Sequence, residues 1–392
     1  MDRRRFTFHE FFAGGGMARA GLGEGWTCLF ANDIDPKKAA VYRDNWSDRA
    51  LVCGSVAEVR PADLEAPADL AWASFPCQDL SLAGDGRGLG KAGALEATRS
   101  GAFWPFWALI KALNAEGRGP TVLVLENVPG VLTSDRGRDF GVIAEVLGKG
   151  GYRFGALVVD ARGFLPQSRP RVFIVALRGG TDAPGGLERG APDERWSPPT
   201  LIAAHGRLSD RARRRWVWWT LPPPDRPPRA LARLLDDAPS DVSWDSPAQT
   251  ARLLAMMSPA NLAKVEQALA KGARTVGTLY RRTRPTPGGG RQSRAEVRFD
   301  DVAGCLRTPS GGSSRQKVLI VAAGEVRSRL LSGREAARLM GLPDSYRLPV
   351  RYNDAYHLAG DGVAVPVVRH LARHIIEPII AANRPPVVLA AE

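Results

Sequence analysis

Apolar and polar positions alternate in blocks through the first 180 residues of the chain. Short apolar runs that end in glycine-containing turns are separated by stretches with helical spacing, and the runs are TFHEFFAGGG, WTCLFANDID, ADLAWASFPC, TVLVLENV and RVFIVALRGG. A run of about five apolar residues is typical of a strand buried on both faces of a parallel sheet. Because GAFWPFWALIKALNAE has the pattern of a crossover helix, residues 1–185 are predicted to form a doubly wound α/β domain with a mostly parallel sheet.

The pattern changes near residue 186, where proline, arginine and tryptophan replace the regular alternation. Residues 186–345 contain segments such as WVWWTLPPPDRPPRALARLLDD, which are typical of loops, short strands and turns, and no internal repeat is detectable. We therefore expect a smaller, irregular second domain. Its tryptophans Trp216, Trp218 and Trp219 have two interpretations, hydrophobic packing of the domain or stacking on nucleic-acid bases.

Helical periodicity returns in SGREAARLMGL. Ser332 is the predicted N-cap of this helix, and Glu335 three residues later completes the pattern of a capping box. Further on, VAVPVVRHLARHIIEPIIAANR predicts an amphipathic helix with a wide apolar face. We expect residues 346–392 to return to the first domain and to dock this helix on it.

Composition and charge narrow the class of protein. The chain has 392 residues, 44% of them hydrophobic, but no window approaches the roughly 18 consecutive apolar residues of a membrane span. Its four cysteines form no CxxC pair, which argues against a disulfide framework or a zinc ribbon. A soluble, cytoplasmic protein with reduced thiols is expected.

The positive charge of the chain is concentrated in one region. Residues 196–330 hold 23 Lys and Arg against 11 Asp and Glu, so they carry +12 of the formal net charge of +13. This concentration favours a surface that faces phosphates.

Two features near the N-terminus predict a site for an adenosine-containing ligand. The turn FFAGGGMARAGL follows an apolar strand, and its glycines allow a ligand to approach the backbone. Asp33 follows the next strand, where a carboxylate typically accepts hydrogen bonds from ribose hydroxyls. These features do not decide between a dinucleotide and S-adenosylmethionine, and purely structural turns are the alternative.

Cys77 and Glu126 follow two further predicted strands, at the carboxyl ends where open α/β sheets bind ligands. A buried cysteine and a carboxylate that caps a turn are the structural alternatives. The glycine-rich run AGDGRGLGKAG follows Cys77. If Cys77 is a nucleophile, it needs access for its substrate, and the segment from about Gln78 to Arg99 is then predicted to be a mobile flap that closes over the site. A disordered surface loop without this role is the alternative.

Five segments resemble, in the correct order, the motif series of the DNA cytosine-5 methyltransferases of bacterial restriction-modification systems. They are FAGGG at 12–16, PCQ at 76–78, ENV at 126–128, QSRPR at 167–171 and SGREAARLMGLPDSY at 332–346. The likeness covers roughly the first 180 and the last 65 residues. The segment between them, which carries the excess positive charge, then occupies the place of the family's variable target-recognition domain.

The resemblance implies a Rossmann-like methyltransferase domain and a reaction. S-adenosyl-L-methionine would donate a methyl group to C5 of a cytosine flipped out of duplex DNA. Cys77 would add to C6, which makes C5 nucleophilic, and the Glu126 carboxyl group would bond N3 and the exocyclic amine. Arg169 and Arg171 would orient Glu126 and the O2 side of the base. The implied partners are duplex DNA and a cognate restriction endonuclease encoded nearby, and the implied state is a monomer.

The resemblance also implies two sets of contact residues. Those toward the cofactor are Phe12, Gly14, Gly16, Asp33, Ile34, Ser55, Val56, Pro76, Asp361 and Val363. Those toward DNA are Gln78, Arg87, Gln167, Leu306, Thr308 and Arg315. The chain departs from the family at three points: Ser55 stands where an acidic residue is expected, GDGV at 360–363 replaces a Gly-Asn-Ser/Ala-Val element, and Cys305 stands where threonine is usual.

No metal site is predicted, because His370 and His374 lack an acidic or cysteine partner and are interpreted as surface residues of the last helix. Two other functions stay open. An enzyme of the same fold would methylate cytosine in transfer RNA, and a regulatory module would bind DNA without catalysis. The presence of both Cys77 and Glu126 argues against the module.

Overall fold

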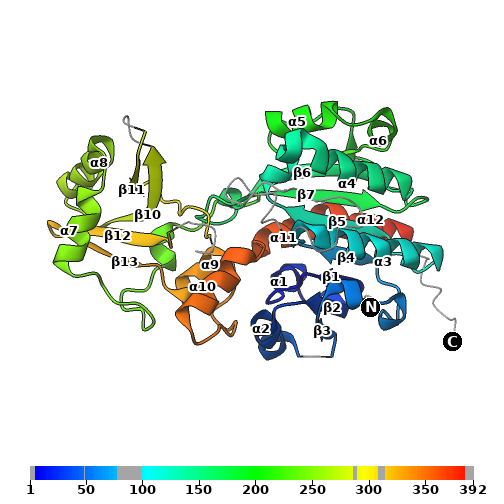
Figure 1. Ribbon diagram of the computed structural model, residues 1–392, viewed down its shortest axis with the longest axis horizontal. Coiled ribbons are helices and arrows are strands. Elements are labelled where there is room, and N and C mark those ends of the chain that lie inside the picture. The colour runs from blue at the N-terminus through cyan, green and yellow to red at the C-terminus, as the bar shows by residue number, and fades with distance from the viewer. Residues whose placement is uncertain (1–4, 48, 77–98, 286–288, 308–313, 385–392) are drawn as a thin grey trace. The chain divides into compact units, whose positions relative to one another are not determined.

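The computed structural model describes residues 5–47, 49–76, 99–285, 289–307 and 314–384. The chain divides into two compact units (Figure 1). Unit 1 comprises Met1–Val159, Pro170–Pro223 and Val367–Glu392, and unit 2 comprises Asp160–Arg169 and Pro224–Pro366. The predicted flap lies outside the described residues as far as residue 98. In the part of the chain that is described, no helix is long and apolar enough to cross a membrane.

Unit 1 is built on a seven-stranded sheet with the order β3-β2-β1-β4-β5-β7-β6 (Figure 1). Its strands are β1 (Phe6–Phe11), β2 (Trp26–Asp33), β3 (Leu51–Cys53), β4 (Leu70–Ala73), β5 (Val122–Asn127), β6 (Arg153–Asp160) and β7 (Pro170–Leu177). Its helices are α1 (Met17–Leu22), α2 (Pro36–Trp46), α3 (Phe103–Ala115), α4 (Arg138–Lys149), α5 (Pro199–Gly206), α6 (Asp210–Arg214), α11 (Val365–Leu371) and α12 (Glu377–Asn383), and a two-stranded sheet pairs β8 (Glu188–Arg189) with β9 (Trp218–Trp219).

The five predicted strands are present, and the doubly wound α/β prediction is confirmed. The first five strands pair in parallel, whereas β7 pairs with β5 in the antiparallel direction. The strand β7 lies between β5 and β6 in the sheet, and only residues 161–169 connect it to β6. This connection is too short for the crossover that joins parallel neighbours, so the chain turns back on itself between β6 and β7. The strand β6 itself was not predicted from the sequence.

The tryptophan-rich segment packs on unit 1. The Trp219 side chain is 1% exposed, and its Nε1 donates to the carbonyl of Val175 in β7. Trp216 and Trp218 pack against the large apolar core of this unit. These contacts support packing rather than base stacking, and they explain why unit 1 extends to Pro223, beyond the boundary expected at residue 185.

The C-terminal segment from Val367 belongs to unit 1, as expected for a docked amphipathic helix. Glu377 accepts a hydrogen bond from the Trp26 indole of β2 at 2.9 Å. Residues 346–366, which were expected to return with it, belong to unit 2. The interpretation of His370 as a surface residue is wrong, because the side chain is 8% exposed and its Nε2 lies 2.8 Å from the carbonyl oxygen of Pro222.

Unit 2 has a regular core that the sequence pattern did not predict. A four-stranded antiparallel sheet with the order β11-β10-β12-β13 packs against α7 and α8. The elements of this unit are α7 (Pro247–Ala255), α8 (Pro259–Ala270), β10 (Thr275–Pro285), β11 (Arg291–Arg298), β12 (Lys317–Ala322), β13 (Glu325–Leu330), α9 (Gly333–Leu339) and α10 (Tyr352–Asp361). The expected irregular domain is therefore a small α+β unit.

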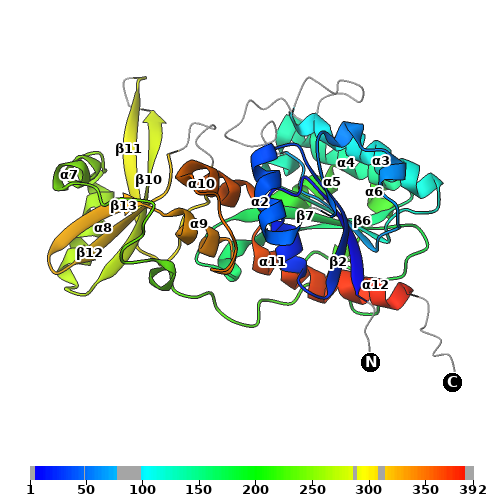
Figure 2. The ribbon, with the colours of Figure 1, turned by 90° about the horizontal axis from the view of Figure 1, so that it is seen from below.

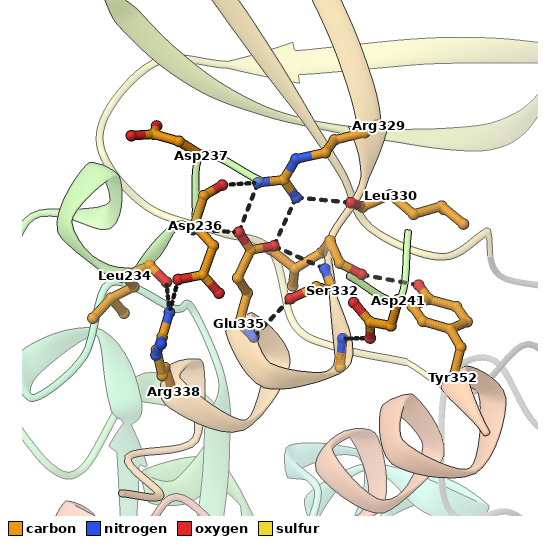
Figure 3. Close-up of polar contacts among 12 residues, drawn as sticks. Leu234, Asp236, Asp237, Asp241, Arg329, Leu330, Ser332, Glu335, Arg338 and Tyr352 are labelled. Carbon is orange, nitrogen blue, oxygen red and sulfur yellow. Dashed lines mark hydrogen bonds and ion pairs between the residues drawn. The ribbon is translucent and has the colours of Figure 1, made fainter. Parts of the chain in front are cut away.

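A buried ion pair joins the end of β13 to α9 (Figure 3). The Arg329 guanidinium makes two parallel bonds of 2.7 Å to the Glu335 carboxylate, and both side chains are fully buried. Arg329 also donates to the carbonyl of Asp236, while Glu335 accepts from the backbone N–H groups of Asp236 and Ser332. The Ser332 hydroxyl accepts from the Glu335 N–H, which confirms the predicted capping box. We name these four residues the Arg329 cluster.

Candidate active site

The strand order reverses between β1 and β4, which places a topological switch point there. The register pairs Phe11 of β1 with Ala73 of β4, and Ala73 with Leu125 of β5. The residues that follow these positions therefore meet at one edge of the sheet. They are Phe12, Ser74 and Glu126, and open α/β sheets bind ligands at this edge.

The glycine turn after β1 is held by Asp33. One carboxylate oxygen of Asp33 accepts from the N–H of Gly14 at 2.7 Å, and the other accepts from the N–H of Asp35 at 2.8 Å. Burial is the largest influence on this carboxyl group and raises its pKa. Phe12, Gly14 and Gly16 all have positive φ angles. Asp33 thus fixes the turn, and each of its oxygens keeps a lone pair that a ribose hydroxyl could use.

The residues around this turn fit an adenosine group. A Cβ placed on Gly14 would have only the Lys38 side chain near it, at 4.0 Å, so the backbone there is open to a ligand. Ile34 directly follows Asp33 and is 68% exposed, an unusual position for a large apolar side chain and one that suits contact with an adenine ring. Val56 is 5% exposed within the core, and the Ser55 hydroxyl caps the short helix Val56–Glu58. These two predicted cofactor residues therefore also stabilise the fold of the protein.

Close packing against Trp46 requires a glycine at position 16. A Cβ at this position would lie 2.4 Å from the indole nitrogen of Trp46, which donates to the carbonyl of Gly15 at 3.0 Å. The α2 helix therefore packs directly against the turn. Only glycine fits here, whether or not a ligand is present.

Glu126 is positioned by an arginine and by its neighbour. Its carboxylate, at the end of β5, lies 3.2 Å from the Nε of Arg171 on the antiparallel strand β7, and Glu126 is 7% exposed. The Asn127 side chain donates to the carbonyl of Phe75 at 3.1 Å. Pro76 follows Phe75 and Cys77 is next in the chain, so this bond holds the segment that leads to Cys77 beside the segment that carries Glu126. The role of Asn127 was not predicted, and only its place in ENV could have indicated it.

Gln167 and Arg169 do not have the surroundings expected of them. The Arg169 side chain is 1% exposed, and its guanidinium donates to the carbonyls of Leu306, Gly360 and Gly362. Gln167 is fully buried, where its amide donates to the carbonyl of Leu339 and accepts from the N–H of Leu306. These bonds connect segments of unit 2, which gives both residues a positioning role.

The expected DNA contacts of Gln167 and Leu306 do not fit this geometry. Gln167 is fully buried and Leu306 is 1% exposed, so neither side chain has an exposed surface that a duplex could reach. Arg315 is half-buried and donates to the Asn353 side chain at 2.5 Å. Asp361 is exposed at the end of α10, and Val363 is buried. The remaining predicted site residues, Cys77, Gln78, Arg87 and Thr308, lie outside the described residues.

A buried polar cluster that the sequence did not reveal lies behind the glycine turn. Glu10 of β1 is 1% exposed and accepts from the N–H of Arg19, and burial raises its pKa to about 8. The Arg19 guanidinium donates to the Tyr42 hydroxyl at 3.0 Å, and the Cys28 thiol lies 3.4 Å from that hydroxyl. Burial also raises the pKa of Cys28, to about 11, so this thiol is not a nucleophile at neutral pH.

Comparisons with known proteins identify the family of this chain. A family model described as "C-5 cytosine-specific DNA methylase" matches residues 6–377. The type II methyltransferase M.HpaII of Haemophilus parainfluenzae is 26% identical over 398 residues, which cover 96% of this chain and 91% of the relative. M2.BsuMI of Bacillus subtilis (strain 168), also a type II methyltransferase, is 37% identical over 170 residues, which cover 43% of this chain and 41% of the relative.

A solved structure shares the fold. The S. pombe Dnmt2 methyltransferase is 16% identical with a TM-score of 0.56, and the match covers 96% of this chain and 99% of that one. The family model spans nearly the whole chain, and members of this family use S-adenosyl-L-methionine as methyl donor. The chain therefore belongs to the C-5 cytosine-specific DNA methylases, and it is a DNA cytosine-5 methyltransferase.

Proposed function

We propose that this chain methylates C5 of a cytosine flipped out of a specific duplex DNA sequence, through a covalent adduct between Cys77 and C6. The observation that carries the proposal is the pair of contacts at the end of β5. Arg171 orients the Glu126 carboxylate, and Asn127 ties the residues before Cys77 to the same strand end. A nucleophile directly after Phe75 and Pro76 would thereby meet the acid at one edge of the sheet, as addition to a cytosine ring requires.

The roles of the residues follow from the chemistry of the ring. The Cys77 thiolate adds to C6, and the electron density that this addition pushes toward N3 is stabilised by a proton held by Glu126. The same carboxyl group accepts from the exocyclic amine. Arg171 keeps the carboxyl group in place. S-adenosylmethionine would supply an electrophilic methyl group to C5 and would leave as the neutral thioether S-adenosylhomocysteine. Loss of the C5 proton to a base, for which water is a candidate, then allows the C6–S bond to break and frees Cys77.

The residues around the glycine turn are proposed to hold the cofactor. Gly14 offers its backbone, Asp33 its carboxylate oxygens, and Ile34 an exposed apolar side chain. Phe12, Gly16, Ser55, Val56 and Pro76 shape the surroundings. We further propose that the enzyme acts as a monomer and that a cognate restriction endonuclease cuts the same sequence, since the curated relatives are named type II methyltransferases.

A labelling assay tests the proposed reaction. Purified chain is incubated with methyl-labelled S-adenosylmethionine and either duplex DNA or transfer RNA, and Cys77→Ala serves as the control. We expect label on duplex DNA only, and none with the variant. Label confined to transfer RNA would replace the proposal with the RNA enzyme, and a folded chain that labels neither nucleic acid would refute catalysis. Duplexes that contain 5-fluorocytosine should trap the wild-type adduct, because fluorine cannot leave as a cation, and Cys77→Ala should form none.

A further inference from the structure

The strands β10 and β11 continue past the four-stranded sheet of unit 2. β12 pairs with β10 only from Thr275 to Leu279, whereas the pairing of β10 with β11 continues to Pro285 and Arg291. Figure 2 shows the two strands projecting beyond β12 and β13. We name residues 280–285 and 291–296 the arginine ribbon, and its outer positions are exposed.

The arginine ribbon carries an unbalanced charge. It contains one acidic residue, Glu296, and five arginines, which are Arg281, Arg282, Arg284, Arg291 and Arg294. Arg282 and Arg294 are direct partners in the register, and like charges in opposite positions of a sheet repel each other. The Glu296 carboxylate lies 2.5 Å from Arg284 and 3.6 Å from Arg282, so one negative charge is shared between two arginines. An anionic ligand would relieve the remaining repulsion.

The arginines and a glutamine gather on the face that the core leaves free. Alternate residues of a strand share a face, so Arg282 and Arg284 lie on the same side as their register partners Arg294 and Gln292. The opposite side continues into Leu279, Ala295 and Val297, which are buried against α7 and α8. The Arg282 guanidinium stacks over the Tyr280 ring on the same face, 4.5 Å from its centroid.

We propose that the arginine ribbon enters the major groove of duplex DNA. This groove is about 12 Å wide and admits a two-stranded ribbon, and arginine and glutamine are the side chains that bond guanine and adenine edges in pairs. On the free face Arg282, Arg284, Gln292 and Arg294 point to base edges, while Arg281 and Arg291 on the other face lie nearer the phosphates. The inference rests on the proposed function only in taking duplex DNA as the substrate.

Salt-dependent binding tests the ribbon without any catalytic step. The affinity of the full chain for a labelled duplex is measured over a range of salt concentrations. The ribbon variant Arg281→Gln/Arg291→Gln, which removes the two arginines placed nearest the phosphates, is compared with Arg252→Gln/Lys271→Gln, which removes the same charge from exposed positions of α7 and the end of α8. Each lost contact lowers the slope of log K against log salt by about 0.9. We expect the ribbon variant to lose about two units of slope and the control less than half a unit. Equal slopes in the two variants would overturn the proposal.

A groove test accompanies the salt titration. In a duplex that contains glucosylated 5-hydroxymethylcytosine, sugar fills the major groove, and we expect the wild type to bind it at least tenfold more weakly than the plain duplex. The variant Arg282→Gln/Arg294→Gln, which lacks two of the arginines placed at base edges, should show little further loss. Wild-type affinity that the sugar leaves unchanged would overturn the major-groove assignment. A chain that passes both binding tests but transfers no methyl group would refute the proposed function and leave the ribbon in place, so the two failures are distinguishable.

Discussion

The Arg329 cluster offers a sharp test of how unit 2 is held together. In the variant Glu335→Gln, the side chain keeps its shape but loses its charge. The Glu335 carboxylate accepts four hydrogen bonds, two from Arg329 and two from the backbone N–H groups of Asp236 and Ser332. An amide has a single acceptor oxygen, so it cannot satisfy all four donors. The Arg329 guanidinium would then be a buried charge without its counter-charge.

The expected loss of unfolding free energy is about 3–5 kcal/mol, the usual effect of removing one partner of a buried pair. Because the chain has two units, a single global unfolding transition is not a safe measure. Hydrogen exchange of the α9 and β13 amides, followed by mass spectrometry in the full chain, reports the opening free energy of this region alone. The double variant Arg329→Met/Glu335→Gln should regain part of the loss, since it no longer buries an unpaired charge.

The control is an arginine–carboxylate pair whose acid is exposed. Arg338 and Asp344 lie 2.7 Å apart, and the Asp344 side chain is 65% exposed. We expect Asp344→Asn to change the local opening free energy by less than about 1 kcal/mol. An effect of Glu335→Gln as small as that of the control would refute the reasoning, as would strictly additive effects of Arg329→Met and Glu335→Gln.

Three further predictions concern unit 1. Burial raises the pKa of Glu10 from 4.5 to about 8, so the folded chain binds more protons than the unfolded chain between these values and stability falls as pH rises through them. Glu10→Gln should abolish this fall, and parallel pH–stability curves for the two proteins would contradict it. Gly16→Ala should destabilise the fold by about 1–3 kcal/mol through strain and collision with a tryptophan nitrogen, whereas Gly25→Ala, with open space around it, should leave the thermal midpoint nearly unchanged. Arg171→Lys should lower kcat by about tenfold or more because the lysine ammonium group does not reproduce the Nε contact of 3.2 Å with Glu126, and a change in KM alone would argue against this role.

Local patterns predicted the features that depend on local physics. The apolar runs predicted five strands of unit 1, and the capping box of Ser332 and Glu335 was visible as a spacing of three residues. Asp33 and Glu126 lie near the ends of β2 and β5, as the apolar runs before them predicted. These predictions succeeded because burial and capping act over a few neighbouring residues.

Contacts between residues that lie far apart in the sequence were not predicted. Nothing in QSRPR indicates that Arg169 donates to the carbonyls of residues 306, 360 and 362, because those acceptors lie well over a hundred positions away. The same holds for the tryptophans near residue 217, which belong to unit 1 through contacts with β6 and β7. The antiparallel sheet of unit 2 was missed since two of its strands, β10 and β11, are rich in arginine, a composition that is typical of loops as well.

The bonds of Gln167 and Arg169 have a consequence for how this enzyme diversifies. Both side chains donate to main-chain carbonyls of unit 2, those of Leu306, Leu339, Gly360 and Gly362. Every amino acid offers the same carbonyl group. Side chains on the sheet of unit 2 can therefore be exchanged during evolution while these bonds persist. A new DNA sequence preference could arise by substitution in β10 and β11, with no compensating change in QSRPR.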